Sequence, residues 1–333
     1  MSVFTPLERH ELETFVEPYR LGRLKNFQGI AAGSENSNFF VSLDGGEFVL
    51  TLIERGPSAD LPFFIDLLAR LHQAGLPVPY AVPTANGQSL RELAGKPALL
   101  QPRLNGKHID QPNAQHCAAI GDWLARLHLA TCDSILERRS DRGLDWMLEQ
   151  GQRLAHELDA AQQLLLCNSL HEIEELQAHI HALPRANLHA DLFLDNALFD
   201  GNRLTGVIDF YNACSGPMLY DLAITVNDWC VQADGGLDPN RTRALLDAYA
   251  ALRPFSRAEA ELWPAMLRIA CLRFWLSRLI AARRFQGRDV LVKDPAEFQR
   301  RLLQRQQTGP RLKAERRLPR EVSLQWKPIG GNG

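Results

Sequence analysis

The feature that most constrains the fold is a change of secondary-structure pattern near residue 104. Before it, short apolar runs predict strands over residues 23–31, 38–43 and 47–54, and a helix over 60–72 follows the third strand. After it, the apolar residues recur mainly at helical spacing. A small antiparallel sheet with a helix against it, followed by a larger helical part, predicts an α+β fold of two lobes.

Local sequence signals predict where two of the helices begin and where one hairpin turns. Residues 5–8 have the T-x-x-E form of a capping box with a proline at the first helical position, which predicts a helix to about Val16. The Asp-Gly-Gly turn at 44–46 separates two apolar runs and predicts a hairpin. Asp60 is expected to cap the helix that follows the third strand.

The second part of the chain is expected to be helical apart from one β-rich island. The predicted helices span residues 113–130, 144–166, 169–182, 217–231, 239–251, 257–285 and 294–306. The island lies at 187–209 and turns at 200–202. These patterns divide the chain into a β-rich lobe over 1–103, a helical lobe over 104–307 and a basic tail over 308–333, which is expected to be mobile or extended.

Charge and cysteine usage narrow the classes of function. The 333 residues include 37 Lys and Arg against 39 Asp and Glu, a net charge of −2, whereas a nucleic-acid binder usually carries a basic excess. No apolar run approaches the roughly 18 residues that span a bilayer, and the first residues lack the pattern of a signal peptide. The six scattered cysteines form no C-x-x-C pair, so we expect reduced thiols, no structural zinc site and a cytoplasmic protein.

The β-rich island carries the residues that indicate chemistry. Asp191 and Asn196 lie in its first half, and Asp209 follows Asn196 by thirteen residues at the end of the next apolar run. A tight turn between the two runs can bring these three side chains to one end of a hairpin. Carboxylate and amide oxygens suit Mg²⁺ bound together with substrate phosphates, and a remaining carboxylate can orient an attacking hydroxyl. The island therefore predicts phosphoryl transfer.

The spacing H-x-D-x-x-x-x-N at His189, Asp191 and Asn196, followed by I-D-F at Asp209, resembles the aminoglycoside phosphotransferase branch of the protein-kinase-like enzymes. The resemblance implies a protein-kinase-like bilobal fold with ATP bound between the lobes. It also implies that Asp191 is the catalytic base and that Asn196 and Asp209 hold Mg²⁺ with ATP. His189 and Asp221 are expected to support the catalytic loop structurally.

Further segments are similar to the bacterial homoserine kinases of this superfamily. They are ENSNFFV (35–41), FVLTL (48–52), LPVP (76–79) and DFYNA (209–213), together with DLA (221–223) and NDW (227–229). The similarity covers roughly residues 5–305. It implies ATP and L-homoserine as substrates and O-phospho-L-homoserine as product, in a step of threonine synthesis.

The nucleotide side departs from the kinase pattern at one position. Thr51 lies on the third strand, where kinases carry a Lys that contacts the phosphates, and the helix over 61–73 holds Asp66 but no Glu to pair with such a Lys. The homoserine kinases look similar to this sequence in having Thr there, so we expect an active enzyme. Its phosphates are then expected to be neutralised by Mg²⁺ and by backbone N–H groups of the turn 33–38.

The residues assigned to the nucleotide come from three segments. They are Gly33, Ser34, Asn36 and Ser37 of the turn, Thr51 of the third strand, and Gln101 and Arg103 of the segment 99–104. That last segment is expected to be the hinge between the lobes, whose backbone hydrogen-bonds the adenine base.

The sequence gives a less specific signal for the residues that bind the acceptor. Arg273 and Arg278 lie on a helix that is otherwise strongly apolar, so each is expected to need a partner, either a substrate carboxylate or a structural ion pair. Asp195 is interpreted as a turn acid rather than a metal ligand. His179 and His181 are interpreted as a solvated helix end rather than a zinc site.

Two alternatives to homoserine stay open. Another small-molecule kinase of the superfamily, of the choline, methylthioribose, aminoglycoside or fructosamine type, would keep the same triad with a different acceptor pocket. A nucleotide-binding regulatory protein without catalysis would explain the missing Lys, but such a protein has no need of Asp191. ATP and a small-molecule alcohol are the expected partners, with no membrane or nucleic acid and no oligomeric state predicted.

Overall fold

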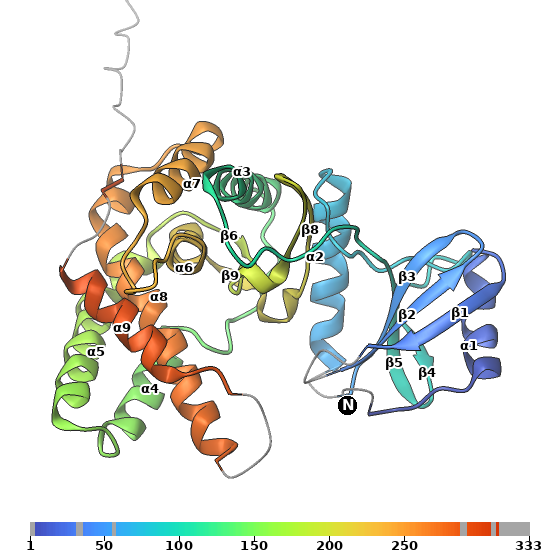
Figure 1. Cartoon of the computed structure of the whole chain (residues 1–333), viewed down its shortest axis with the longest axis horizontal. Helices are drawn as coiled ribbons and strands as arrows, with labels where there is room; N and C mark the ends of the chain where they lie inside the picture. The colour runs from blue at the N-terminus through green and yellow to red at the C-terminus, as the bar shows by residue number, and fades with distance from the viewer. Residues whose placement is uncertain (1–3, 31–35, 55–57, 287–291, 308–310, 313–333) are drawn as a thin grey trace, which may run out of the picture.

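The computed structural model describes residues 4–30, 36–54, 58–286, 292–307 and 311–312, and Figure 1 shows a sheet part beside a larger helical part. The helices are α1 (Arg9–Val16), α2 (Leu61–Gln73), α3 (Ala114–Thr131), α4 (Leu144–Ala155), α5 (Ala160–His181), α6 (Met218–Trp229), α7 (Pro239–Leu252), α8 (Arg257–Arg284) and α9 (Pro295–Gln307). The strands are β1 (Leu24–Gly29), β2 (Ser37–Leu43), β3 (Gly46–Leu52), β4 (Arg91–Leu93), β5 (Lys96–Pro102), β6 (Arg185–Leu188), β7 (Ala197–Asp200), β8 (Arg203–Val207) and β9 (Cys214–Pro217). Two 3₁₀ turns matter below, η3 (Leu194–Asn196) and η4 (Phe210–Asn212).

The first five strands form one antiparallel sheet in the order β1-β2-β3-β5-β4. The hairpin between β2 and β3 turns at Asp44 and Gly45, so that Leu43 pairs with Gly46, as the Asp-Gly signal predicts. This sheet, followed by the helical part, confirms the predicted α+β fold with a small antiparallel sheet first.

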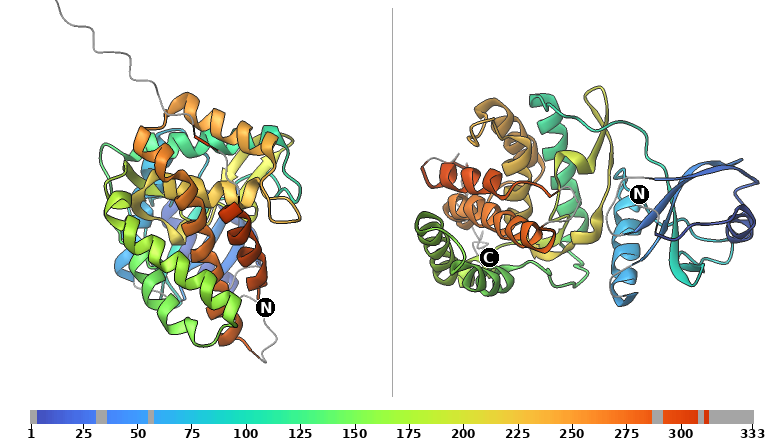
Figure 2. Two further views of the ribbon diagram at one scale, coloured as in Figure 1. Left: turned by 90° about the vertical axis from the view of Figure 1, so that its left-hand side faces the viewer. Right: turned by 60° about the horizontal axis from the view of Figure 1, so that its bottom comes forward.

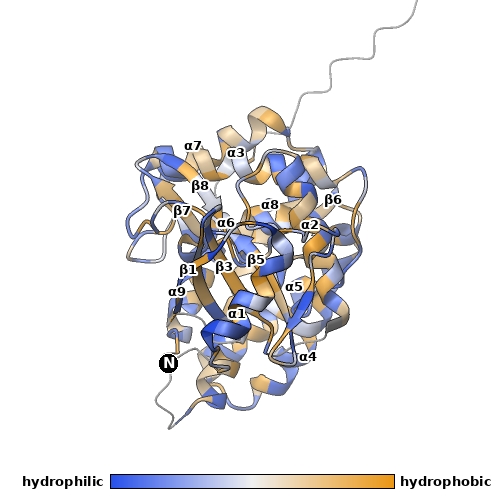
Figure 3. Ribbon diagram, turned by 90° about the vertical axis from the view of Figure 1, so that its right-hand side faces the viewer, coloured by the Kyte–Doolittle hydropathy of each residue, from blue (hydrophilic) through white to orange (hydrophobic). Residues whose placement is uncertain are grey.

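The two faces of the sheet have different partners. Leu50 and Leu52 of β3 share one apolar core with Leu12 and Phe15 of α1. Figure 3 looks onto α1, which carries polar residues in front of the largely apolar strands. Because side chains alternate along a strand, Thr51 points to the opposite face. In Figure 1 α1 covers the side of the sheet that is away from the helical part, so the face with Thr51 is turned toward that part.

The helix α2 stands between the sheet and the helical part in Figures 1 and 2. Its Leu67, Leu68 and Leu71 belong to the core of the helical part rather than to the core under α1. Arg70 of the same helix donates to the backbone carbonyl of Ser134. The apolar side of α2 is therefore fixed to the helical part, while the sheet lies on its other side.

Two small antiparallel sheets, β6–β9 and β7–β8, lie within the helical part and carry the predicted β-rich island. They pack around α6, in which every residue is buried. Trp229, Trp263 and Trp275 are fully buried in the same core. None of the helices in the described ranges has the length and apolar character needed to cross a bilayer.

The predicted helix over 144–166 is wrong in its end, which lies at residue 155, eleven residues before the predicted one. The helix α4 ends at Ala155, and α5 begins at Ala160 and continues through the predicted break at 167–168. Asp159 starts the new helix by accepting a hydrogen bond from the backbone N–H of Gln162 at 2.9 Å. The apolar spacing on both sides hides this cap.

The capping box predicted at residues 5–8 is also wrong. The helix α1 begins at Arg9, and the side chain of Glu11 accepts from the backbone N–H of Glu8 at 2.8 Å. The threonine of the predicted box instead accepts from the ammonium group of Lys96 at 2.6 Å. Glu8 and Glu11 thus form the capping box, three residues after the predicted one.

Two more predictions concern chain segments rather than the site. Asp60 precedes α2, but its side chain does not cap the helix; it binds Arg138 at 2.9 Å instead. The basic tail predicted over 308–333 lies outside the described residues except at 311–312.

Candidate active site

One loop and one hairpin bring the predicted acid and amide side chains together. The loop 189–196 follows β6 and ends at Asn196, where β7 begins, and the hairpin β7–β8 leads back to Asp209. The backbone N–H of Ile208 donates to the carbonyl oxygen of Asn196 at 2.9 Å. The structure therefore places Asn196 and Asp209 side by side at one end of the hairpin.

His189 is fully buried and connects the two segments. Its Nε2 lies 3.0 Å from the carbonyl oxygen of Ile208, and its Nδ1 lies 3.3 Å from the backbone nitrogen of Asp191. Since Nδ1 accepts from that N–H, Nε2 carries the proton that is donated to Ile208. The imidazole also packs on Phe210, with ring centroids 4.6 Å apart. His189 thus fixes Asp191 relative to the segment that leads to Asp209.

Asp221 of α6 binds the same loop from inside the helical part. Its fully buried carboxylate accepts from the backbone N–H groups of His189 and Ala190, each at 2.8 Å, and lies 3.2 Å from Nε2 of His128. Burial disfavours the charged form, but the hydrogen bonds outweigh it and hold the pKa of Asp221 below its ordinary value. Ala190 has a left-handed φ of 60°, which costs an L-residue free energy and is maintained by this contact.

Asp191 keeps part of its carboxylate open, with 21% of the side chain exposed. Nδ2 of Asn212, in η4, donates to its Oδ2 at 3.1 Å. Nη1 of Arg273, on α8, lies 3.5 Å from its Oδ1. A carboxylate held by two donors and still reached by solvent can orient a hydroxyl that binds beside it and accept its proton.

Asn196 and Asp209 offer the oxygen donors of a metal site. Nδ2 of Asn196 donates to the backbone carbonyl of Asp191 at 2.8 Å, which orients the amide so that Oδ1 is the atom that could bind a metal. No group of three or more His, Cys, Asp or Glu in the described ranges is arranged to hold a metal by itself. One amide oxygen and one carboxylate fit a hard divalent cation that takes its other ligands from phosphate and water. Asp195 instead pairs with Lys293 at 2.9 Å.

Three of the residues predicted for the nucleotide lie on the sheet part with partners of their own. Thr51 is buried, and its hydroxyl donates to Oδ1 of Asn38 at 2.7 Å. Gln101 donates to a backbone carbonyl at 2.5 Å. The guanidinium of Arg103 lies over the ring of Phe40, 4.1 Å from its centroid. The register of β3 and β5 places Thr51 and Gln101 on the sheet face opposite α1, and Arg103 is the charged member of the three.

The predicted phosphate turn is described only in part. Gly33 and Ser34 lie outside the described residues. The side chain of Asn36 accepts from the backbone N–H of Glu54 at 3.1 Å, and the hydroxyl of Ser37 donates to the carboxylate of Glu54 at 2.5 Å. The hydroxyl of Ser37 and the amide oxygen of Asn36 thus bind protein groups, so a contact of these two residues with phosphate would come from the Nδ2 of Asn36 or from the backbone.

The two arginines predicted for the acceptor lie in different surroundings. Arg273 contacts Asp191, whereas Arg278 pairs with the carboxylate of Glu297 and donates to a backbone carbonyl before α9 at 3.0 Å. The structure therefore does not bring Arg278 to Asp191; it joins α8 to α9. The two histidines at the C-terminal end of α5 are exposed, as expected of a solvated helix end.

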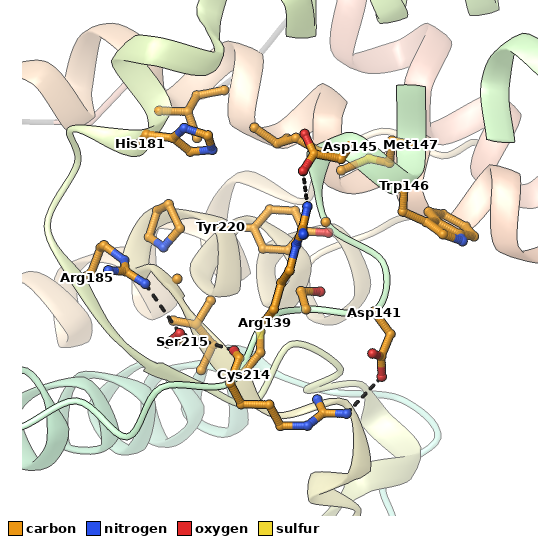
Figure 4. Close-up of a pocket in the computed structure, with 18 of the residues that line it drawn as sticks. Arg139, Asp141, Asp145, Trp146, Met147, His181, Arg185, Cys214, Ser215 and Tyr220 are labelled. Atoms are coloured by element: carbon orange, nitrogen blue, oxygen red, sulfur yellow. Dashed lines mark hydrogen bonds and ion pairs between the residues drawn. The ribbon is translucent and has the colours of Figure 1, made fainter. Parts of the chain in front are cut away.

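A cavity of about 910 Å³ lies next to this site, between the segment 137–149, the end of α5 and β9. Figure 4 shows Arg139 and Asp145 paired on one side of it, with Tyr220 of α6 behind them. Burial raises the pKa of Tyr220 far above its ordinary value, so this phenol stays protonated. Asp191, Asn196 and Asp209 do not line the cavity.

The sequence does not predict two contacts of the site. Asn212 lies three residues after Asp209 in the DFYNA segment, and that position is the signal from which its contact with Asp191 could be found. His128, in the last turn of α3, gives no such signal, because it belongs to no motif. Only the fold brings it to Asp221, while its Nδ1 lies 2.8 Å from the hydroxyl oxygen of Tyr249.

Comparisons with known proteins give the relatives of this chain. The model of the phosphotransferase enzyme family matches residues 26–255, more than half of the chain. The chain is 68% identical over 306 residues to a homoserine kinase of Pseudomonas aeruginosa (strain UCBPP-PA14), and the match covers 92% of this chain and 97% of that one. It is 46% identical over 301 residues to a homoserine kinase of Methylobacillus flagellatus, covering 90% and 94%.

Solved structures of the same fold are more distant in sequence. An aminoglycoside phosphotransferase from Alicyclobacillus acidocaldarius superposes with a TM-score of 0.64 at 17% identity, over 91% of this chain and 94% of that one. An amicoumacin kinase solved with AMP-PNP and Ca²⁺ gives a TM-score of 0.64 at 16% identity, over 90% and 93%. These likenesses show the fold alone, and they confirm the protein-kinase-like architecture that the resemblance implies.

Proposed function

The chain belongs to the homoserine kinases of the phosphotransferase enzyme family, and from this membership we propose that it transfers the terminal phosphoryl group of ATP to the hydroxyl of L-homoserine. The product is O-phospho-L-homoserine, in a step of threonine synthesis. One observation carries the proposal: the polar groups of Asp191, Asn196 and Asp209 are gathered around one end of the β7–β8 hairpin, and the Asp191 carboxylate is partly open to solvent.

Asp191 acts on the acceptor. The acceptor hydroxyl hydrogen-bonds a carboxylate oxygen of Asp191, which orients the hydroxyl oxygen toward the terminal phosphorus of ATP. As the new O–P bond forms and the bond to ADP breaks, Asp191 accepts the hydroxyl proton. Asn212 and Arg273 hold the carboxylate in place during this step.

Asn196 and Asp209 hold the divalent cation that accompanies ATP, which we take to be Mg²⁺. Such a cation would neutralise charge on the phosphates. The two residues supply one amide oxygen and one carboxylate, and that small donor set leaves positions for phosphate and water oxygens.

The sheet part binds the remainder of the nucleotide. The segment 99–104 joins the two lobes and offers its backbone to the adenine base. Thr51 brings no charge to the phosphates, so the cation would neutralise them, together with backbone N–H groups of residues 33–38 as the sequence predicts. We place the reaction in the cytoplasm, because the six cysteines are all unpaired and reduced thiols suit that compartment.

The test is an assay of ADP release with a panel of acceptors. The panel contains L-homoserine, L-serine, L-threonine, choline and kanamycin, and ³¹P NMR identifies the phosphorylated product. We expect the highest kcat/KM with L-homoserine and little or no turnover of choline or kanamycin. Preferred turnover of choline or kanamycin would place the chain with another small-molecule kinase. ATP binding without ADP release from any acceptor would indicate a nucleotide-binding regulator.

A further inference from the structure

Two guanidinium groups converge on one neutral oxygen beside Asp191. Nη1 of Arg142 and Nη2 of Arg273 each lie 3.3 Å from Oδ1 of Asn212. The amide nitrogen of the same Asn212 donates to Asp191 at 3.1 Å. Arg142, Asn212 and Arg273 come from distant parts of the chain, namely the loop before α4, the turn η4 and the helix α8.

An amide oxygen is a weak partner for two guanidinium groups. A guanidinium binds a carboxylate with two parallel, charge-assisted hydrogen bonds, which are roughly twice as strong as those to a neutral acceptor. An incoming carboxylate can therefore compete with Oδ1 of Asn212 for both arginines. Arg273 is 4% exposed, so its charge is already desolvated and held on α8, whereas Arg142 is exposed on its loop and can adjust.

The distances suit a short amino-acid acceptor. In L-homoserine four bonds separate the hydroxyl oxygen from the carboxylate carbon, a span of roughly 5 Å at ordinary bond lengths. The hydrogen-bonded path from Asp191 through Asn212 to Arg142 consists of two contacts of 3.1 and 3.3 Å across one amide group. A molecule with its hydroxyl at Asp191 can thus reach the two guanidinium groups with its carboxylate.

We propose that Arg142 and Arg273 together bind the carboxylate of the acceptor, and that Asn212 holds both arginines and Asp191 in register before the acceptor arrives. This inference rests on the proposed function, since it concerns the acceptor of the same reaction. It assigns substrate contact to Arg142, for which the sequence offers no signal, and it gives Arg273 a partner other than Asp191.

The test crosses two variants with two acceptors. Arg142→Gln removes the charge, and Arg139→Gln is the matched control, because Arg139 lies on the same loop but pairs with Asp145 (Figure 4). The acceptors are L-homoserine and 3-aminopropan-1-ol, which is homoserine without its carboxylate. We expect Arg142→Gln to lower kcat/KM for homoserine about ten- to a hundredfold, mainly through KM, and to leave kcat/KM for 3-aminopropan-1-ol within about twofold.

Equal losses with both acceptors would show that Arg142 acts only on the structure, and no loss with homoserine would place the carboxylate elsewhere. Calorimetric binding of L-2-aminobutyrate, which is homoserine without its hydroxyl, gives the same comparison where the amino alcohol turns over too slowly. Arg142→Gln should weaken this binding, and Arg139→Gln should not. Unchanged affinity for MgATP shows that each variant is folded.

The outcomes separate this inference from the proposed function. If the wild-type enzyme prefers L-serine, homoserine fails as the acceptor, but the comparison of L-serine with ethanolamine still decides whether Arg142 binds a carboxylate. If it prefers choline or an aminoglycoside, which carry no carboxylate, both proposals are overturned. If it prefers homoserine and Arg142→Gln changes nothing, only this inference is overturned.

Discussion

The loop that carries Asp191 and the strand that carries Thr51 are positioned by different kinds of contact. On the helical side, the loop is bound by a buried carboxylate, Asp221, and the proposed base, Asp191, is contacted by Arg273. On the sheet side, Thr51 is buried and its hydroxyl donates to the neutral amide of Asn38. We therefore expect the charge for the proposed reaction to come mainly from the helical side and from the cation that accompanies ATP.

The helix α2 is also positioned by a charged residue of the helical part. In kinases a Lys on the third strand pairs with a Glu of the following helix; here Thr51 cannot do so. Instead Arg138, from the helical part, binds Asp60 at the start of α2 at 2.9 Å and the carbonyl oxygen of Ala213 at 2.9 Å. Its guanidinium also lies 5.0 Å from the ring centroid of Phe64. Thus α2 is tied to the segment after Asp209 rather than to the sheet.

The largest effect is expected from Asp191→Asn. The amide cannot accept the hydroxyl proton, so kcat should fall by about 10²–10⁴, the usual contribution of a positioned base. The affinity for MgATP should stay the same. Asp195→Asn is the matched control, because Asp195 lies in the same loop and pairs outward with Lys293. If Asp191→Asn kept more than about half of the wild-type kcat, the assignment of the base would be wrong.

Asp209→Ala should abolish the Mg²⁺ dependence of ATP binding while the fold stays intact. The carboxylate is proposed as a direct ligand of the cation, and the cation links it to the phosphates. Calorimetric titration with ATP in the presence and absence of Mg²⁺ measures this dependence. Asp200→Ala, at the exposed tip of the same hairpin, should leave it unchanged. An unaltered response of the Asp209 variant to Mg²⁺ would remove Asp209 from the metal site.

Asp221→Asn should reduce both stability and turnover. The N–H groups of His189 and Ala190 use different carboxylate oxygens, one of which becomes an NH2 group in the amide, so one buried donor loses its partner at a cost of about 1.5–3 kcal/mol. The lowered pKa of Asp221 adds a test by pH. Its ionised form stabilises the fold above about pH 4, and this contribution is lost as the pH falls below that value. The difference in unfolding free energy from wild type should therefore shrink in acid, whereas a constant difference would contradict the assignment.

Arg138→Ala tests the link between α2 and the helical side. Loss of the contacts to Asp60 and Ala213 should let α2 move relative to the segment after Asp209, and kcat/KM for ATP should fall about tenfold. Arg138→Lys keeps the charge but not the planar fork, so it should restore only part of the activity. Arg139→Ala is the control on the same loop. Wild-type kinetics in Arg138→Ala would mean that apolar packing alone positions α2.

The sequence predicts features with local signals, but it does not predict contacts between distant residues. The sheet and the set of Asp191, Asn196 and Asp209 are predictable because turns and motif spacing are local signals. The contact between His128 and Asp221 joins residues 93 positions apart, and no local pattern encodes it. The break between α4 and α5 is missed for a related reason: a cap at Asp159 interrupts an apolar spacing that continues on both sides.

The smallest effect is expected from Thr51→Ala, and it bears most directly on the contrast between the two sides. A hydroxyl cannot replace the charge of a Lys, so its removal should cost less than about tenfold in kcat/KM, roughly 1.4 kcal/mol. Thr51→Val removes the hydroxyl but keeps the shape, and Thr51→Ser keeps the hydroxyl, so the pair separates packing from hydrogen bonding to Asn38. A collapse of activity in Thr51→Ala and Thr51→Val, with Thr51→Ser unaffected, would show that the hydroxyl binds the phosphates. The sheet side would then take part in the electrostatics, and the division of roles drawn from Asp221 and Thr51 would fail.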